Sequence, residues 1–176
     1  GVKPSFFLNG ISPAQLLAFS TSSSAAALPV TMERVEEHLG VDSEVASFVC
    51  PVGATINMDG TSLYQAVAAV FITQALDFDL DFNDQLTIVL TATLASIGSA
   101  AVPGAGMVML VIVLESIGLP ADKLAIGLAL IFAVDRPLDM CRTVINVTGD
   151  ATVSMVVAKS VGKLGKPEVR NWDDNY

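Results

Sequence analysis

The sequence is short of charge, and positive charge is scarcest. Charged residues make up 15% of the 176 residues, against about a quarter in an ordinary soluble domain. Lys and Arg number 9 and Asp and Glu 18, which gives a net charge of −9, and the cations form no cluster. A protein that binds nucleic acid presents a basic patch to the phosphates. The composition therefore argues against nucleic acid as a partner.

Cysteine and histidine are almost absent. The cysteines Cys50 and Cys141 lie far apart in apolar segments, and His38 is the one histidine. Isolated cysteines favour neither a thiolate metal site nor a disulfide framework. A serine nucleophile would have only His38 to activate it, in a charged segment that we interpret as exposed surface. The residue inventory disfavours a hydrolase, and no enzyme is predicted.

Uncharged hydrophobic sequence is what the chain has in abundance. Hydrophobic residues make up 52% of it, and the mean hydropathy is +0.62. No charged side chain occurs between Asp84 and Glu115, and a helix needs only about 20 apolar residues to span a bilayer. The composition predicts an all-α membrane protein. A soluble protein with a deeply buried core is the alternative.

The hydrophobic segments are interrupted by residues that disfavour helices. Residues 43–55 and 61–76 are helical segments separated by "NMDG", which predicts two half-helices that meet at an unwound joint. In residues 86–119, "GSAAVPGAG" predicts the tip of a re-entrant hairpin. "TSSSAAALP" around Ser22 is interpreted as the turn of a second, shorter hairpin, with Pro29 in the first turn of the following helix. Interrupted hydrophobic segments are typical of transporter binding sites.

Residues 121–161 predict one long C-terminal helix with a kink at Pro137. At about 100° per residue, six of its polar side chains fall within an arc of about 100°. They are Asp135, Asp139, Arg142, Thr143, Asn146 and Asp150. Each charge placed in a bilayer costs about 2.5–3.5 kcal/mol, so the stripe predicts a buried polar cavity rather than a lipid-facing surface. Structural pairing of Arg142 with Asp139 is the alternative explanation.

The stripe and the interruptions together predict a site for a cation beside an anionic solute. Asn57 and Asp59, with carbonyl oxygens freed at the joint, are hard ligands that suit Na⁺ better than zinc or copper. A buried Arg142 is the natural bidentate partner of a carboxylate, and Asp139, about one turn away, suits an ammonium group. The two side chains match a zwitterion that carries an additional carboxylate.

Four segments resemble the signature sequences of a known family. "TSSSAAALPVT", "PVGATINMDGTSLYQ", "LASIGSAAVPGAG" and "DRPLDMCRTVINVTGD" occur in the order found in the glutamate/aspartate transporters, the dicarboxylate/amino acid:cation symporters. The resemblance implies two re-entrant helical hairpins, one broken transmembrane helix and one long C-terminal transmembrane helix. The corresponding regions are 1–40 (an N-terminally truncated first hairpin with its connecting loop), 41–79 (broken helix), 80–119 (second hairpin), 120–162 (last helix) and 163–176 (polar tail).

The resemblance also implies the function. The chain would be the substrate- and cation-binding core of a secondary active symporter for aspartate or glutamate, coupled to Na⁺ without an organic cofactor. It would work by elevator-type movement in the inner or plasma membrane, crossing the lipid bilayer several times. Scaffold helices would precede Gly1 and assemble the full-length parent into a homotrimer. A C4-dicarboxylate or other amino acid symporter, a truncated fragment without transport activity, and an ion-conducting or structural membrane module are the alternatives.

The family resemblance assigns ligands residue by residue. Arg142 would bind the side-chain carboxylate and Asp139 the α-amino group, with further substrate contacts from Ser23, Ser24, Met58, Thr61, Val102, Thr143 and Asn146. One sodium ion would be held by Gly53, Asn57, Asn146 and Asp150. Another would be held by Thr55, Ser96, Ile97 and Ser99, with Asp59 near a third. Because C4-dicarboxylate carriers lack the acid and neutral amino acid carriers lack the arginine, the pair favours an acidic amino acid.

Three positions depart from the pattern of the family. Gln65 stands where animal excitatory amino acid carriers have Glu. Because Gln carries no proton, we predict no proton coupling through this position. Those carriers have an Arg at the position of Met140, and some prokaryotic relatives have one at Ser22; neither is present here. Our hypothesis is that Arg136 fills that role.

Overall fold

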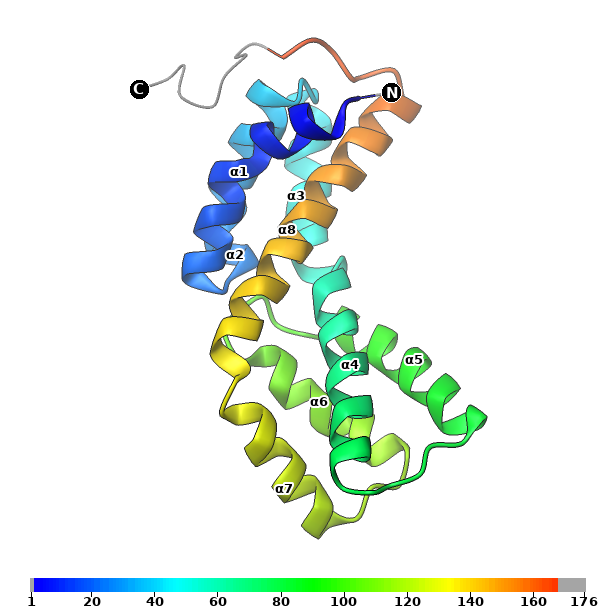
Figure 1. Cartoon of the computed structure of the whole chain (residues 1–176). Helices are drawn as coiled ribbons and strands as arrows, with labels where there is room; N and C mark the ends of the chain where they lie inside the picture. Colours follow the sequence, from blue (N-terminus) through cyan, green and yellow to red (C-terminus); the bar gives the residue numbers. More distant parts are fainter. Residues whose placement is uncertain (1, 168–176) are drawn as a thin grey trace.

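The computed structural model describes residues 2–167, whose regular elements are all helices (Figure 1). The all-α prediction is confirmed; residue 1 and residues 168–176 of the predicted polar tail lie outside the described residues. The elements are α1 (Pro4–Thr21), α2 (Ser24–Glu33), the π-helix η1 (Arg34–His38), α3 (Ser43–Ile56), α4 (Asp59–Ala75), α5 (Phe82–Ile97), α6 (Ala105–Ser116), α7 (Ala121–Phe132) and α8 (Asp135–Ser160). Across residues 2–167, no helix combines the length and apolar character of a membrane span.

The molecule has two halves that meet at the first turns of α8. Figure 1 shows α1, α2, α3 and most of α8 in one half, and α4 to α7 in the other. Each half has its own hydrophobic core, the first around Ile11, Val35 and Met155 and the second around Ile72 and Leu114. Complete burial of such a side chain contributes about 1.5–3 kcal/mol. The two cores hold the halves in place on either side of the polar stripe.

The chain reverses between α1 and α2 over two serines. Ser22 ends α1 with a left-handed φ of 52°, and its N–H donates to the carbonyl of Ala18 at 2.9 Å. Ser23 caps α2, because its hydroxyl accepts from the N–H of Ala26 at 3.1 Å. The predicted turn is present, but Pro29 lies inside α2 and not in its first turn. The serine cap starts the helix earlier than the proline suggested.

The predicted unwound joint is present and is only two residues long. Asn57 (φ −87°, ψ 73°) and Met58 (φ −103°, ψ 54°) leave the helical region between α3 and α4. Asp59 and Gly60, which we expected to belong to the joint, are already part of α4. A carboxylate in the first turn of a helix is stabilised by the helix dipole, which favours this start.

The second hairpin consists of α5 and α6, which pack together and are joined by residues 98–104. A reciprocal capping box between Asp81 and Asp84 begins α5. Gly104, with a left-handed φ of 78°, precedes α6 and lets the chain turn into that helix. The re-entrant position of this hairpin in a bilayer stays a prediction.

The prediction of one kinked helix over residues 121–161 is wrong. The chain leaves the helix at Ala133 and Val134, so α7 and α8 are separate, and Pro137 lies in the first turn of α8. Pro137 has no N–H to donate to the carbonyl of Ala133 four residues earlier, and its ring crowds that carbonyl. The break therefore lies one turn before the proline.

The interpretation of His38 as a surface residue is also wrong. His38 and Arg34 are both 2% exposed, on a π-helix that packs against α1 and α2. The Nε of Arg34 donates to the carbonyl of Gly10 at 2.8 Å and ties this turn to α1. The polar sequence around His38 gave no indication of the helices that cover it.

The described part of the polar tail runs along the loop before α3. Val41 and Leu164 form an isolated antiparallel bridge. The N–H of Asp42 donates to the carbonyl of Lys163 at 3.1 Å, and the ammonium of Lys163 pairs with Glu44. The end of α8 is thereby attached to the start of α3.

Candidate functional site

The polar stripe of α8 lies where the α3–α4 joint and both hairpin tips meet, at the boundary of the two halves (Figure 1). Five of its six side chains are buried, and Asp135 is half-buried. The five are 1–5% exposed: Asp139, Arg142, Thr143, Asn146 and Asp150. Since buried polar groups need partners, the contacts of these side chains define the site.

Arg142 is at the centre of the first group of contacts. Its guanidinium forms an ion pair with Asp139, and both side chains are almost completely buried. Its Nη1 donates to the hydroxyl of Thr61 on α4 at 3.1 Å. Its Nε has no hydrogen-bond partner within residues 2–167. The ion pair between Arg142 and Asp139 that the sequence suggested is thus present. It leaves the buried Nε–H of the guanidinium without an acceptor within residues 2–167.

Asp139 connects α8 to the second hairpin. Its Oδ2 accepts from the backbone N–H of Gly104, at the end of the tip, at 3.0 Å. The same oxygen lies 4.0 Å from Nη1 of Arg136, whose side chain is 58% exposed. An ion pair so accessible to water contributes little to stability. The hydroxyl of Thr143 donates to the carbonyl of Asp139 at 2.9 Å, within α8 itself.

Asn146 connects α8 to the joint. Its Oδ1 accepts from the N–H of Gly60 at 2.8 Å, a donor that the first turn of α4 leaves without a helical partner. Its Nδ2 donates to the hydroxyl of Thr61 at 3.2 Å and lies 3.4 Å from the sulfur of Met58. One amide therefore contacts Met58 of the joint and two residues in the first turn of α4.

The close approach of the first turn of α4 to α8 depends on Gly60. A β-carbon there would lie 2.3 Å from the carbonyl oxygen of Arg142, which is backbone and cannot rotate away. We expect Gly60→Ala to lower the free energy of unfolding by about 1–3 kcal/mol. Gly98→Ala is the matched control, because its β-carbon would meet nothing nearer than 3.8 Å. Thermal unfolding of both variants measures the difference, and equal stability of the two would contradict the expectation.

A second group of contacts lies farther along α8. The Nδ2 of Asn57 donates to Oδ1 of Asp150 at 3.0 Å. A β-carbon on Gly53 would lie 2.4 Å from the same oxygen, so glycine leaves room for the carboxylate. A β-carbon on Gly149 would lie 2.8 Å from Oδ2 of Asp59 and 2.9 Å from Nδ2 of Asn57. The amide of Asn57 and the carboxylate of Asp59 thus lie beside residues 149–150 of α8, and carboxylate and amide oxygens are ligands of the kind that hard cations prefer.

The two hairpin tips touch each other. The hydroxyl of Ser23 donates to the carbonyl of Ala101 at 2.7 Å, and Ser24 is buried at the start of α2. Val102 is 49% exposed, and its carbonyl accepts from the N–H of Ala105 within the tip. The hydrogen bonds between the second tip and the rest of the site are thus made by the backbone of Ala101 and Gly104, on either side of Val102.

Within residues 2–167, no side-chain hydrogen bond joins the four residues predicted for a second cation, although the N–H of Ser99 donates to the carbonyl of Ser96 at 3.1 Å. The hydroxyls of Thr55 and Ser96 donate to carbonyls of their own helices, at 2.9 and 2.8 Å. Ile97 is exposed, while Ser99 is buried and its hydroxyl has no partner within residues 2–167. In the same residues, no group of three or more His, Cys, Asp or Glu side chains forms a metal site. This second set stays a prediction.

Comparison with known proteins identifies the family. The sequence model of the sodium:dicarboxylate symporter family matches residues 1–160. The chain belongs to this family. The resemblance predicted from the four signature segments is confirmed.

The three relatives described here are transporters by name and not enzymes. Excitatory amino acid transporter 5 from Homo sapiens is 53% identical over 155 residues, covering 88% of this chain and 27% of the relative. Excitatory amino acid transporter 1 from Rattus norvegicus is 49% identical over 170 residues, 97% of this chain and 30% of the relative. Excitatory amino acid transporter 3 from Oryctolagus cuniculus is 52% identical over 170 residues, 97% of this chain and 31% of the relative. The chain thus spans about a third or less of their length.

Three contacts of this symporter-family site escaped the sequence analysis. Two are made by the backbone of Ala101 and Gly104, which carries no side-chain signal. The third is the hydroxyl of Tyr64, which donates to Oδ1 of Asp135 at 2.7 Å. Tyr64 lies three residues after Thr61, and that spacing, which puts both on one face of α4, could have predicted its place.

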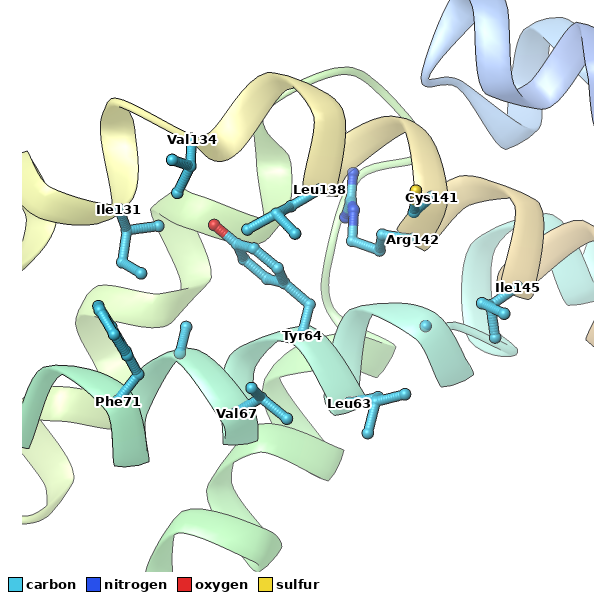
Figure 2. Close-up of a pocket in the computed structure, with 12 residues that line it drawn as sticks. Leu63, Tyr64, Val67, Phe71, Ile131, Val134, Leu138, Cys141, Arg142 and Ile145 are labelled. Atoms are coloured by element: carbon cyan, nitrogen blue, oxygen red, sulfur yellow. The ribbon is translucent and has the colours of Figure 1, made fainter. Parts of the chain in front are cut away.

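An apolar pocket of about 450 Å³ lies beside the polar site, between α4, α7 and α8 (Figure 2). The walls of this pocket are largely aliphatic and aromatic, and the two polar side chains of Tyr64 and Arg142 also line it. The other lining residues are Gly60, Leu63, Val67, Ala68, Phe71, Ile131, Val134, Leu138, Cys141 and Ile145. Figure 2 shows Tyr64 reaching from α4 toward the start of α8 among the residues that line this pocket.

Proposed function

We propose that the chain is the substrate- and cation-binding core of a secondary active symporter that takes up aspartate or glutamate with Na⁺. One observation carries the proposal. Arg142, Asp139 and Asp150 lie on one buried stripe of α8, and the interruption between α3 and α4 places Asn57 against Asp150. Arg142 and Asp139, the ionic groups for the solute, lie on neighbouring turns of α8. The oxygens for a cation lie about two turns farther along the same helix, around Asp150. Such an arrangement suits the joint binding of a charged amino acid and a hard cation.

The solute binds by replacing one internal ion pair with two new ones. Arg142 and Asp139 neutralise each other, and separating buried partners without replacement would cost about 3–5 kcal/mol. An acidic amino acid supplies both replacements, because its side-chain carboxylate binds the guanidinium and its α-ammonium binds Asp139. A C4-dicarboxylate would leave Asp139 without a cation, so the buried carboxylate favours an amino acid.

Coupling to the cation runs through the joint. Na⁺ is bound by oxygens of four residues, Gly53, Asn57, Asn146 and Asp150, and Asp59 lies near a further cation. Binding there holds the joint against α8. The first turn of α4, directly after the joint, carries the Thr61 hydroxyl that accepts from Arg142. Because both ligands favour one arrangement of the joint, each raises the affinity for the other.

The remaining features belong to a longer protein. The names of the family and of the relatives support sodium and acidic amino acids as ligands, and the relatives are about three times as long as this chain. We place the chain in a homotrimeric membrane protein of the plasma or inner membrane, together with scaffold helices. The α5–α6 hairpin closes over the solute, and the domain then moves across the bilayer as an elevator. Gln65, buried with its amide 3.4 Å from the carbonyl of Gly106, carries no proton in this cycle.

Calorimetric titration of the full-length parent with L-aspartate tests the proposal. Replacing NaCl by choline chloride should weaken binding at least about a hundredfold, or about 2.7 kcal/mol. Succinate in NaCl is the matched ligand control, because it has both carboxylates and no ammonium. Binding that is indifferent to Na⁺ would refute symport with sodium, and tighter binding of succinate would favour the C4-dicarboxylate alternative.

A further inference from the structure

The structure contains a brace between α4 and the start of α8 that the proposed binding reaction does not use. The hydroxyl of Tyr64, in the middle of α4, donates to Oδ1 of Asp135 at 2.7 Å. Asp135 is the first residue of α8, directly after the break at Ala133 and Val134. Both side chains are half-buried, so the hydrogen bond is partly shielded from water. A hydrogen bond to a carboxylate is stronger than one between neutral groups.

This brace lies at the start of α8, where no side chain caps the helix. Val134, the residue before the helix, makes no side-chain cap, and α7 is not continuous with α8. The carboxylate of Asp135 stabilises the helix start through the dipole, and Tyr64 holds that carboxylate against α4. Arg142 lies seven residues later on the same face of α8. A rotation of the first turns would therefore change the direction of its guanidinium.

The ring of Tyr64 also lies beside the guanidinium. A β-carbon on Gly106 would lie 3.0 Å from Nη1 of Arg142 and 3.4 Å from Cδ1 of Tyr64, so both flank one point of α6. Thr61, one turn before Tyr64 on α4, accepts from the same Nη1. Figure 2 shows Tyr64 and Arg142 as neighbours at the edge of the apolar pocket. The pocket, of about 450 Å³, could accept the ring if its hydroxyl were not held.

We propose that Tyr64 and Asp135 are positioning residues that hold Arg142 in the direction required to bind a side-chain carboxylate. The inference rests on the proposed function. Bidentate recognition of a carboxylate needs the guanidinium within about 0.5 Å of its place, whereas a neutral amide makes no such demand. Loss of the brace therefore weakens binding of an acidic solute more than binding of its neutral analogue. Tyr64 and Asp135 therefore set the preference for the acidic solute over its neutral analogue.

The test compares L-aspartate with L-asparagine, which has the same shape and no side-chain carboxylate. Dissociation constants are measured in saturating NaCl on the full-length parent. The preference is the dissociation constant of L-asparagine divided by that of L-aspartate. Tyr64→Phe keeps the ring and removes the hydroxyl, and Asp135→Ala removes the acceptor; each should lower the ratio by about fivefold or more. Asp135→Asn should stay near the wild-type ratio, because its amide oxygen still accepts from Tyr64. The Tyr64→Phe/Asp135→Ala double variant should be no worse than either single change.

Thr148→Val is the structural control. It removes the 2.9 Å hydrogen bond from Nε2 of Gln15 to the Thr148 hydroxyl, which also ties α8 to another helix and does not touch Arg142. Its ratio should equal that of the wild type. If Tyr64→Phe does not fold, the comparison of Asp135→Ala with Asp135→Asn decides alone.

Three outcomes overturn the inference. The first is a Tyr64→Phe ratio equal to the wild type, whatever its thermal stability. The second is an equal loss in Asp135→Asn and Asp135→Ala, and the third is an equal loss in Thr148→Val. A wild-type protein that does not prefer L-aspartate to L-asparagine would overturn the proposed function, and this inference with it.

Discussion

Replacement of Arg142 by cysteine is expected to abolish the binding of L-aspartate and L-glutamate. Arg142 is the buried cation of the site, 5% exposed, and it supplies the donors for the side-chain carboxylate. Its removal also leaves Asp139 buried without its ionic partner. Burying the side-chain carboxylate of the solute without its ionic partner costs about 3–5 kcal/mol, which corresponds to a loss of affinity of roughly 150-fold to several thousandfold. Calorimetric titration in saturating NaCl measures this loss.

Arg136→Cys is the matched control for this variant. Arg136 is on the same helix and 4.0 Å from the same carboxylate, but its side chain is 58% exposed. Because water screens this pair, we expect affinity to change by about threefold at most. Thermal unfolding establishes that both variants are folded. Unchanged affinity in Arg142→Cys would remove the substrate assignment, and an equal loss in Arg136→Cys would transfer part of the role to that residue.

Asp150→Asn is expected to raise the Na⁺ concentration needed for half-maximal binding of L-aspartate. Asp150 is 2% exposed, and Asn57 donates to its Oδ1 at 3.0 Å. The asparagine keeps the size of the side chain but removes the negative charge that a cation requires. The increase should be at least about tenfold, since contacts to a charged group are worth about 1.5–3 kcal/mol. Titrations with L-aspartate over a series of NaCl concentrations measure it.

The Na⁺ series also separates a cation ligand from a structural residue. If Asp150 binds the cation, high NaCl should restore most of the affinity for L-aspartate, because only the cation step is weakened. Asp122→Asn, at an exposed position in the first turn of α7, should leave the Na⁺ dependence unchanged. A wild-type Na⁺ dependence in Asp150→Asn would exclude Asp150 from the cation site.

The elements that were predicted best are those for which neighbouring residues decide the backbone. The serines at 22 and 23 end one helix and cap the next, and Gly104 takes the left-handed conformation that the second tip needs. Asn57 and Met58 interrupt the helix where "NMDG" predicted. The errors arose where an effect acts at a distance along the chain: Pro137 breaks the helix one turn before itself.

The sequence by itself determined the helical class, the interruptions at "NMDG" and at the two hairpin tips, and the polar stripe of α8. Helical periodicity and the backbone preferences of Gly, Pro, Ser and Asn act locally, so they can be read along the chain. Only the tertiary structure decided which partners each stripe residue has. The N–H of Gly104 on Asp139 and the hydroxyl of Tyr64 on Asp135 come from segments far away in sequence. The burial of His38 likewise depends on helices that its own neighbours do not specify.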